Sequence, residues 1–551
     1  MFGGVKFFEF KDKKIAQRYL IGSPKGSLKL FQADKFWCYY NTQNERFFCD
    51  KNNELFIIMQ GDIRILGKDR DKEILDLYKT YGQDFIKHIA GIFSCVLWDS
   101  KNSVLILSVD LFGIKPMYYH TKSKNGLLFS NSINPLINCI NPKLNDAAVY
   151  QFMVFGFVVG NECIAEDINK ISNSSYLIYT SSQSIKVHKY YDIRISPENK
   201  PFEYYRENIA TKLFEIVKDY SKDTDKASVA FSGGLDSSII LSLLSKLNKT
   251  VSAFTAVIEG KQDDRARYVK EYAEHYCSDY REIVINENKV AKYFTDSINH
   301  MSQPVCDTDA PIIFILTKSL KNSPLVFFGK GADELYCSSE HYRLKSGNIK
   351  APMNFSKTLN SNIIFSLPYL VRSKKIEKNS LMKNNLLKHN LRFFHSISKF
   401  GFFELNRQFF DLAYYIGSET STPDAIYTKN NVNYIYPFLD KEFVNLSLKI
   451  PLAYKRRENI DKYILRNSFS KILMKQIYRA PKLSTSIPPN WITDNVSSEE
   501  ILDKSKLLKK YFKKEYLKKV DKDANSKEFI SLLILELWHQ NFLAVGGKES
   551  E

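Results

Sequence analysis

The sequence has no run of 18 apolar residues, so we predict no membrane-spanning helix. Its first four residues, Met-Phe-Gly-Gly, do not begin the basic and then apolar pattern of a secretory signal peptide. The eight cysteines include no Cys-x-x-Cys pair, and this spacing indicates neither a zinc site nor a disulfide framework. Together these absences predict a cytoplasmic protein in a reducing compartment.

Acidic residues are outnumbered by basic ones, 61 to 79, which gives a formal net charge of +18. A basic surface attracts nucleic acid, acidic membranes or anionic substrates. The sequence lacks the aromatic and arginine-rich motifs of common RNA-binding modules, so we predict no nucleic-acid partner and interpret the excess as a solvated lysine surface. A length of 551 residues, 44% of them hydrophobic and 25% charged, indicates a globular chain of two or more domains.

The most informative stretch is 228–240, where a small and apolar run leads into Ser-Gly-Gly-Leu-Asp-Ser-Ser and a second apolar run. This pattern predicts a strand, a tight turn and a helix. The N–H groups of such a turn converge on an anion, and Asp236 is placed to hold a metal ion that bridges phosphates. The alternative interpretation is an ordinary strand-to-helix turn with a Ser or Asp cap.

The complete string resembles the pyrophosphate loop of ATP-pyrophosphatases, enzymes that cleave ATP to AMP and pyrophosphate. The resemblance implies two further nucleotide contacts: Ala230, before the loop, and Ala256, in a strand at 253–257 beside the adenine. Both positions also suit ordinary core strands. The implied ATP-binding residues of the loop are Ser232, Gly233, Gly234, Leu235, Asp236, Ser237 and Ser238.

The first 195 residues contain short strand-like runs that alternate with turn residues, and one helical stretch at 73–81. This pattern predicts stacked or sandwiched antiparallel sheets. The segments 91–99, 110–119 and 129–132 resemble the class II glutaminase domain of asparagine synthetases, which has an N-terminal-nucleophile fold. The predicted strands are 36–40, 55–59, 93–98, 104–109, 117–119 and 127–129.

We therefore expect two domains, divided at a polar linker over 193–201 that contains two prolines. Residues 1–200 are expected to form an α+β sandwich of antiparallel sheets, similar to a glutaminase. Residues 201–551 are expected to form an α/β ATP-pyrophosphatase domain with a parallel sheet and helical additions, because strand and helix patterns alternate after the linker.

The glutaminase-like segment departs from its family at the catalytic position. The family places its nucleophilic cysteine directly after the initiator Met, and the matching residue here is Phe2. Gln60-Gly61-Asp62 replaces the usual Asn-Gly-Glu. Cys38, Cys49 and Cys95 lie in or beside strand patterns and are expected in the core. We predict that this domain does not hydrolyse glutamine and serves as a scaffold or as a dock for a partner.

A second loop, 325–335, resembles the family's Ser-Gly-x-Gly-x-Asp-Glu segment. The resemblance implies that Asp333 joins Asp236 in binding Mg²⁺ on the ATP phosphates. It also implies nucleotide contacts at Phe328, Gly329 and Lys330. Lys330 stands where relatives have an acidic residue or a tyrosine, so we take it as a candidate catalytic residue that clamps an anionic substrate or phosphate.

Three more segments follow the family's order. Asp307 matches an aspartate of its Gln-Pro-x-x-Asp segment, with a substrate role or a structural one. The motifs at 436–440 and 462–466 precede Lys482, which aligns with the catalytic lysine that stabilises charge on phosphorus and carbon. The stretch 346–433 matches poorly, and Glu419 within it is a possible buried partner. We expect a basic helix at 502–520 and an apolar core helix at 529–542.

The resemblance implies an ATP-dependent ligase that adenylates a carboxylate, releases pyrophosphate and joins the acyl group to an amine. With Phe2 in place of cysteine, we favour an amine on the substrate itself, as in β-lactam synthetases and lasso-peptide macrolactam cyclases. A cyclase would act on a peptide and would work with a partner protease or leader-peptide-binding protein. The alternatives are an asparagine synthetase that takes free ammonia for aspartate or another carboxylate, and a non-catalytic homologue that binds a peptide or partner.

Overall fold

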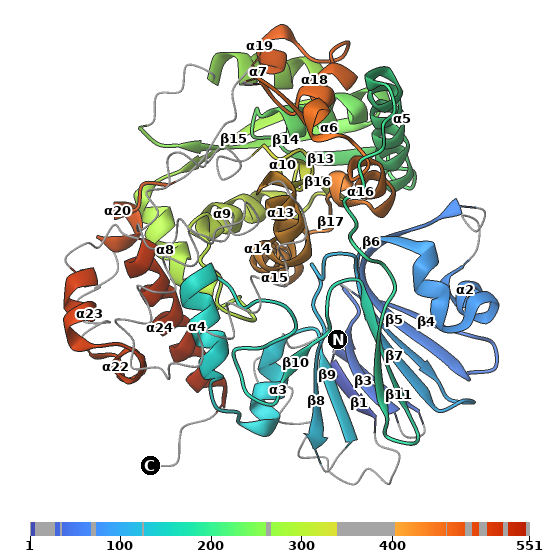
Figure 1. Cartoon of the computed structure of the whole chain (residues 1–551), viewed down its shortest axis with the longest axis vertical. Helices are drawn as coiled ribbons and strands as arrows, with labels where there is room; N and C mark the ends of the chain where they lie inside the picture. Colours follow the sequence, from blue (N-terminus) through green and yellow to red (C-terminus); the bar gives the residue numbers. More distant parts are fainter. Residues whose placement is uncertain are drawn as a thin grey trace, which may run out of the picture.

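The computed structural model describes residues 2–5, 28–33, 36–43, 45–67, 73–123, 126–260, 266–338, 403–458, 460–479, 487–494, 504–521 and 527–546. Figure 1 shows two halves, an antiparallel β sandwich that contains the N-terminus and an α/β half above it. No helix in these ranges is long and apolar enough to cross a bilayer.

The sandwich consists of two antiparallel six-stranded sheets. The first has the order β10 (Asn169–Lys170), β8 (Tyr118–Ser123), β9 (Gly126–Ser130), β1 (Phe2–Val5), β3 (Phe36–Asn41) and β2 (Leu28–Ala33). The second has the order β12 (Ile185–Lys189), β11 (Ser175–Thr180), β7 (Val104–Val109), β6 (Ile89–Asp99), β5 (Leu55–Ile65) and β4 (Glu45–Cys49).

Strand β7 shows how the sequence pattern builds this sandwich. Leu105, Leu107 and Val109 point into the core between the two sheets. Ile106 points to the opposite face, into a second core beneath α2 (Ile74–Tyr81) and the 3₁₀ helix η2 (Gly82–His88). This alternation with a period of two is the pattern of a strand buried on both faces, and it confirms the predicted antiparallel sandwich.

The second half contains a parallel sheet with the order β15 (Asp279–Ile285), β14 (Thr250–Ile258), β13 (Lys226–Ala230), β16 (Val326–Phe327) and β17 (Tyr434–Ile435). In Figure 1, α6 (Leu235–Lys246) and α7 (Ala266–Tyr276) lie above this sheet, and α5 (Phe202–Tyr220) lies to its right. Helices α8 (Glu287–Ile298) and α9 (Ala310–Leu320) lie below it. The predicted α/β domain with a parallel sheet is confirmed, and its strands end at one shared edge.

Further short helices complete this half of the chain. They are α10 (Ala332–Leu335), α13 (Phe403–Phe410), the π-helical turn η6 (Asp411–Tyr415), α14 (Ile416–Glu419), α15 (Ser421–Lys429), η7 (Pro437–Leu439), α16 (Lys441–Ser447), α17 (Leu452–Lys455), α18 (Tyr463–Ser468), α19 (Lys475–Arg479) and α20 (Asn490–Thr493). A hairpin of β18 (Arg456–Arg457) and β19 (Ile460–Asp461) precedes α18.

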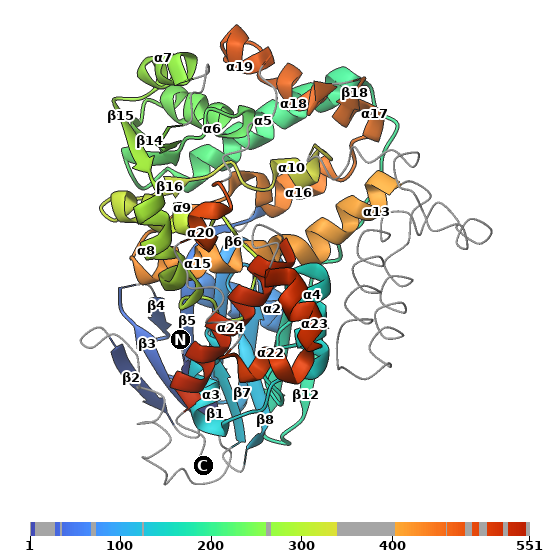
Figure 2. The ribbon, with the colours of Figure 1, turned by 90° about the vertical axis from the view of Figure 1, so that its left-hand side faces the viewer.

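The C-terminal helices pack against the first half of the chain. Figure 2 shows α24 (Lys527–Gly546) beside α3 (Ile133–Ile140) and α4 (Asp146–Phe155), and contacts join α24 to both. The expected apolar core helix is therefore present. The expected single basic helix at 502–520 is wrong, because α22 (Lys506–Tyr511) and α23 (Lys514–Asp521) are separated at Phe512. The buried Phe512 has an extended backbone, with φ −127° and ψ 148°, and this ends the first helix.

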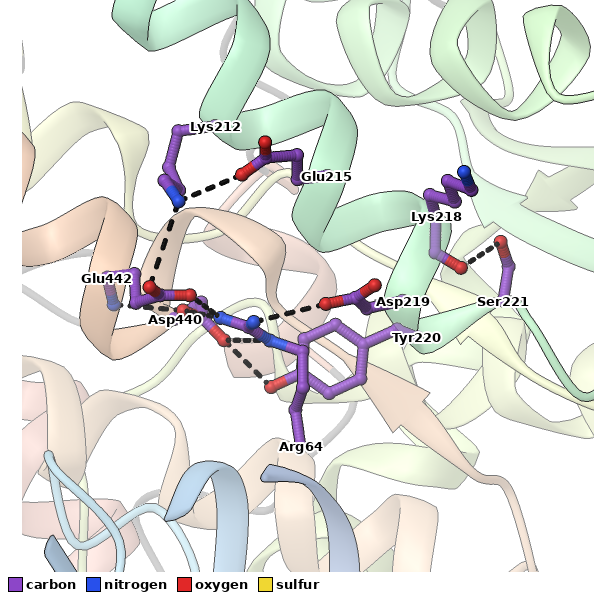
Figure 3. Close-up of polar contacts among 9 residues, drawn as sticks. All are labelled: Arg64, Lys212, Glu215, Lys218, Asp219, Tyr220, Ser221, Asp440 and Glu442. Atoms are coloured by element: carbon purple, nitrogen blue, oxygen red, sulfur yellow. Dashed lines mark hydrogen bonds and ion pairs between the residues drawn. The ribbon is translucent and has the colours of Figure 1, made fainter. Parts of the chain in front are cut away.

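A buried ion network joins the two halves around Arg64, at the end of β5 (Figure 3). Its Nη2 lies 2.8 Å from Asp440 Oδ1 and 2.6 Å from Glu442 Oε2, and its Nη1 lies 3.2 Å from Asp219 Oδ2. The hydroxyl of Tyr220 donates to Asp440 Oδ2 at 3.1 Å. Burial alone would lower the pKa of Arg64, but Asp440 and Glu442 outweigh it and raise that pKa, so the guanidinium stays charged.

A second buried ion pair joins the halves farther along the interface. Lys115 Nζ lies 2.5 Å from Asp424 Oδ1 on α15, and the hydroxyl of Tyr434 donates to the same oxygen at 2.7 Å. Because paired charges tolerate burial and single ones do not, these contacts fix the sandwich against the α/β half. The boundary near residue 200 stays a prediction.

Candidate active site

The first wall of the site is the turn between β13 and α6. Gly233 has a φ of +71°, and an added Cβ there would lie 2.4 Å from Val269 Cγ2, so glycine is required. The N–H of Ser232 donates to Ser237 Oγ at 3.2 Å, which closes the turn. Helix α6 has Gly234 as its N-cap and therefore no capping side chain. Its first N–H groups and its dipole favour an anion at this point.

The second wall is the loop after β16, which lies beside β13 in the sheet. A Cβ on Gly329 would lie 2.9 Å from Asp236 Cβ and 2.9 Å from Ser237 N, so glycine lets the two loops touch. Gly331 has a φ of +98°, and a Cβ there would lie 2.3 Å from Leu439 Cδ2. The second loop is therefore held between the first loop and the segment that leads into α16.

The two loops enclose a cavity of about 290 Å³. Most of the residues that the sequence singled out line it. They are Ala230, Ser232, Gly234, Leu235, Asp236, Ser237, Phe328, Gly329, Lys330 and Asp333. The structure also adds Glu334, Ser338, Asp461, Lys462 and Arg466, to which the sequence assigned no role.

Lys462 is the most important of these additions. Its Nζ lies 2.5 Å from Asp236 Oδ2 and 3.0 Å from Asp333 Oδ1, and its side chain is only 7% exposed. Burial alone would lower the pKa of Lys462, but the two carboxylates outweigh it and raise that pKa. Its motif, Lys-x-x-Leu-Arg, was visible in the sequence. The sequence could not show that Lys462 contacts Asp236, because the two residues are 226 positions apart in the chain.

Asp236 and Asp333 are close enough to each other to share one cation. Oxygens of Asp236 and Asp333 approach the same nitrogen, so the carboxylates converge on one cation position. In the described ranges no three His, Cys, Asp or Glu side chains form a metal-binding group. Mg²⁺ commonly takes one or two carboxylates and completes its shell with phosphate oxygens and water, so this pair suits Mg²⁺ bound together with a nucleotide.

Lys330 is paired with a carboxylate. Its Nζ lies 2.6 Å from Oε2 of Glu419, the residue considered as a possible buried partner. Burial alone would lower the pKa of Lys330, but Glu419 and Glu334 outweigh it and raise that pKa. Asp307 lies near this pair and does not line the cavity; burial and the neighbouring Asp309 raise the pKa of Asp307 to about 7.

Four other sequence-predicted residues lie elsewhere. Gly233 and Ser238 do not line the cavity, and the hydroxyl of Ser238 donates to Gly234 O at 2.8 Å. Ala256 lies partly exposed on β14 and does not line the cavity. Lys482 lies outside the described residues. The nucleotide roles of all four stay predictions.

The glutaminase-like half has a different polar cluster at the matching strands. Phe2 lies in β1, paired with Tyr39 and Ser130 on its two sides. The side-chain amide of Asn131 donates to Gln60 Oε1 at 2.9 Å and to Glu45 Oε1 at 3.2 Å. The strand cysteines Cys38 and Cys95 are fully buried, as expected, whereas Cys49 is partly exposed.

Comparison with known proteins agrees with this arrangement. Residues 208–540 match the asparagine synthase family, and residues 65–191 match a glutamine amidotransferase domain. Asparagine synthetase (glutamine-hydrolyzing) 1 of Bacillus subtilis strain 168 is 22% identical over 553 residues, covering 92% of this chain and 86% of that protein.

Two further relatives cover less of the chain. A putative asparagine synthetase (glutamine-hydrolyzing) of Mycobacterium tuberculosis H37Rv is 21% identical over 472 residues, covering 77% of this chain and 71% of that protein. Amidase chry2 of Gibberella zeae is 24% identical over 310 residues, and the match spans 52% of this chain and 46% of the amidase.

The match to the asparagine synthase family, over residues 208–540, covers more than half of the chain. It includes both loops of the cavity and Lys462. The chain therefore belongs to the asparagine synthase family and is an ATP-dependent carbon–nitrogen ligase.

Proposed function

We propose that this chain adenylates a substrate carboxylate with ATP and joins it to an amine that the substrate itself carries, without hydrolysing glutamine. The observation that carries the proposal is the cavity in which Asp236, Asp333 and Lys462 meet beside the uncapped start of α6. These groups supply what pyrophosphate release requires: N–H donors, a fixed positive charge and a pair of carboxylates for a cation.

In the first step, an oxygen of the substrate carboxylate attacks the α-phosphorus of ATP. The bond from this phosphorus to the bridging oxygen breaks, and pyrophosphate leaves with the electron pair. The first loop and Lys462 would hold the leaving phosphates through N–H groups and one ammonium. Asp236 and Asp333 would hold Mg²⁺, which neutralises charge on those phosphates when bound. Lys482 keeps its predicted role at the phosphorus.

In the second step, the amine nitrogen attacks the acyl carbon. The bond from this carbon to the AMP oxygen breaks, the electron pair leaves with AMP, and the extra proton on the nitrogen passes to water. The products are an amide and AMP. Water must be excluded during this step, because it would hydrolyse the acyl-adenylate.

Three observations support a nitrogen source other than glutamine. The strand position that matches the family's nucleophilic cysteine is Phe2. Gln60 replaces the usual asparagine and is bound by Asn131. Cys38 and Cys95, which lie inside strands, are fully buried and have no free α-amine to act as a base.

A peptide substrate is supported by the paired state of Lys330. A free aspartate molecule would need a cation for its second carboxylate, and Lys330 is already paired with Glu419. We therefore favour a peptide macrolactam cyclase, with the partner protease or leader-peptide-binding protein that such an enzyme would use. The second candidate is amidation of aspartate or another carboxylate by free ammonia, which the similarity to the B. subtilis asparagine synthetase favours.

One experiment separates these functions. Purified protein is supplied with ATP and Mg²⁺, and with either a candidate precursor peptide or aspartate plus ammonium chloride, while AMP and product masses are followed. AMP formation with loss of one water from the peptide supports the cyclase. Asparagine formation supports the second candidate. Peptide binding without AMP from any substrate would leave a non-catalytic binding protein and would reject the ligase proposal.

Asp236→Ala is the control for the site. It removes one of the two carboxylates that meet Lys462 and should abolish AMP formation. Undiminished AMP formation by this variant would show that the chemistry takes place elsewhere. Glutamine added in place of ammonium should give no glutamate.

A further inference from the structure

Several carboxylates lie around Lys330, which lines the cavity. Glu419 pairs with Lys330 directly, at 2.6 Å. Asp307, Asp309 and Glu334 all act electrostatically on this pair or are acted on by it. Four carboxyl groups therefore share a single ammonium. We call these four residues and Lys330 the acidic cluster.

One member of the acidic cluster has an unused acceptor. The side chain of Glu334 is buried, with the residue only 8% exposed, and it lines the cavity. Its Oε2 has no hydrogen-bond partner within the described ranges. A buried carboxylate oxygen without a donor is costly, because the protein has removed its water without replacing it. Such an oxygen indicates a donor that arrives with a ligand.

We propose that Asp307, Glu334 and Glu419 bind the amine substrate as a primary ammonium, next to the carboxylate that ATP activates. The proposal rests on the proposed ligase function and names the chemical class of its second reactant. The ligand is an amine with three N–H donors, such as the α-amine or a lysine side chain of a peptide.

Two features of the acidic cluster favour a primary ammonium. Lys330 shows that such a group fits at 2.6 Å from Glu419. The cluster also has four carboxyl groups to one ammonium. Burial is the largest cause of the raised pKa values of Asp307 and Asp309, about 7 and about 6, and repulsion adds to both, from Asp309 and Glu419 on Asp307 and from Glu419 on Asp309. An arriving ammonium would relieve the repulsion and supply the donor that Glu334 lacks. A neutral ligand could supply a donor but would not relieve the repulsion, and an anionic ligand would increase it.

The position of the acidic cluster also suits the reaction. Glu334 follows Asp333 directly, so the proposed amine site adjoins the proposed nucleotide site. Glu419 comes from α14, beside a π-helical turn, an irregularity that often marks functional sites. The inferred role is binding and placement of the amine.

Calorimetric titration tests the proposal without knowledge of the natural substrate. The protein is first saturated with Mg²⁺ and α,β-methylene-ATP, which resists cleavage between the α and β phosphates. Glycinamide is then titrated as a primary ammonium that lacks a carboxylate, and N-acetylglycinamide as its matched neutral analogue. We expect glycinamide to bind at least about tenfold more tightly than its analogue, because charge-assisted hydrogen bonds are the stronger ones.

Three variants complete the test. Asp307→Asn and Glu419→Gln should each weaken glycinamide at least about tenfold while the ATP analogue still binds. Glu198→Gln removes the same charge from an exposed ion pair with Lys449 and should leave both affinities unchanged. The amine site would be overturned if glycinamide bound no more tightly than N-acetylglycinamide. It would also be overturned if wild type, Asp307→Asn and Glu419→Gln bound glycinamide with equal affinity. Failure of wild type to bind the ATP analogue would instead reject the proposed ligase function.

Discussion

The ammonium of Lys462, the N-cap residue of α18, lies 2.5 Å from the carboxylate of Asp236, in the first turn of α6. The same nitrogen contacts Asp333 at 3.0 Å. The ammonium of Lys462 therefore lies between the carboxylates of Asp236 and Asp333. This contact organises the candidate site before any nucleotide is bound.

Lys462→Met should reduce exchange of labelled pyrophosphate into ATP by about 30- to 100-fold. The variant removes a buried, charge-assisted contact of about 2–3 kcal/mol that the leaving phosphates would share. Lys449→Met is the control, because it removes an exposed lysine that pairs only with Glu198 among the described residues. Exchange that falls equally in both variants would contradict the role of Lys462.

Arg64→Ala should lower the free energy of unfolding by about 3–5 kcal/mol, because Asp440 would be left buried without its cation. Urea unfolding measures this change. Tyr191→Phe is the matched control, since it removes a hydrogen bond between the same two halves at an exposed position, to Asn445. A loss below about 1 kcal/mol in Arg64→Ala would show that the network does not hold the halves together.

Gly331→Ala should abolish binding of an ATP analogue by forcing the second loop away from Leu439, whose Cδ2 lies 2.3 Å from the added carbon. Gly160→Ala separates this clash from backbone strain, because Gly160 also has a positive φ, +75°, and no atom within 4 Å of an added Cβ. Both variants should lose about 1 kcal/mol of stability from strain. Nucleotide affinity should fall only in Gly331→Ala, and normal affinity there would count against the loop's position.

The affinity for glycinamide should fall as pH drops through about 7. Asp307 has its pKa raised to about 7 by burial and by Asp309, so below that pH it is neutral and no longer attracts an ammonium. Asp309, Glu419 and Lys330 act electrostatically on the same group. Titrations between pH 5.5 and 7.5 in wild type and Asp307→Asn test this prediction. Identical pH profiles would exclude Asp307 as the titrating group.

Local patterns carried the fold prediction well. The alternation of residues in 104–109 gave β7 with the bounds that the structure shows, because each side chain of a strand faces one side or the other. The glycines of the two loops likewise mark positions where backbones touch. The break at Phe512 was missed, since a buried aromatic residue in a lysine-rich helical pattern gives no local signal for an extended backbone.

The candidate site was predicted only where a motif described it. Asp236 and Asp333 were singled out from glycine-containing loops. Lys462 was seen without a role, because its contact with Asp236 joins the start of α18 to the start of α6, which lie far apart in the sequence. Arg64 gave no signal at all, since its partners lie 155 to 378 residues away. Contacts of this kind follow from packing of the two halves, which no local pattern encodes.

The central claim is tested most directly with ATP labelled at the α-phosphorus. Wild type, supplied with Mg²⁺ and either the precursor peptide or aspartate plus ammonium chloride, should convert the label to AMP in amounts equal to the amide formed, and Asp236→Ala should form no AMP. Label recovered in ADP, or AMP formed equally well by Asp236→Ala, would contradict adenylation at the cavity that Asp236, Asp333 and Lys462 define.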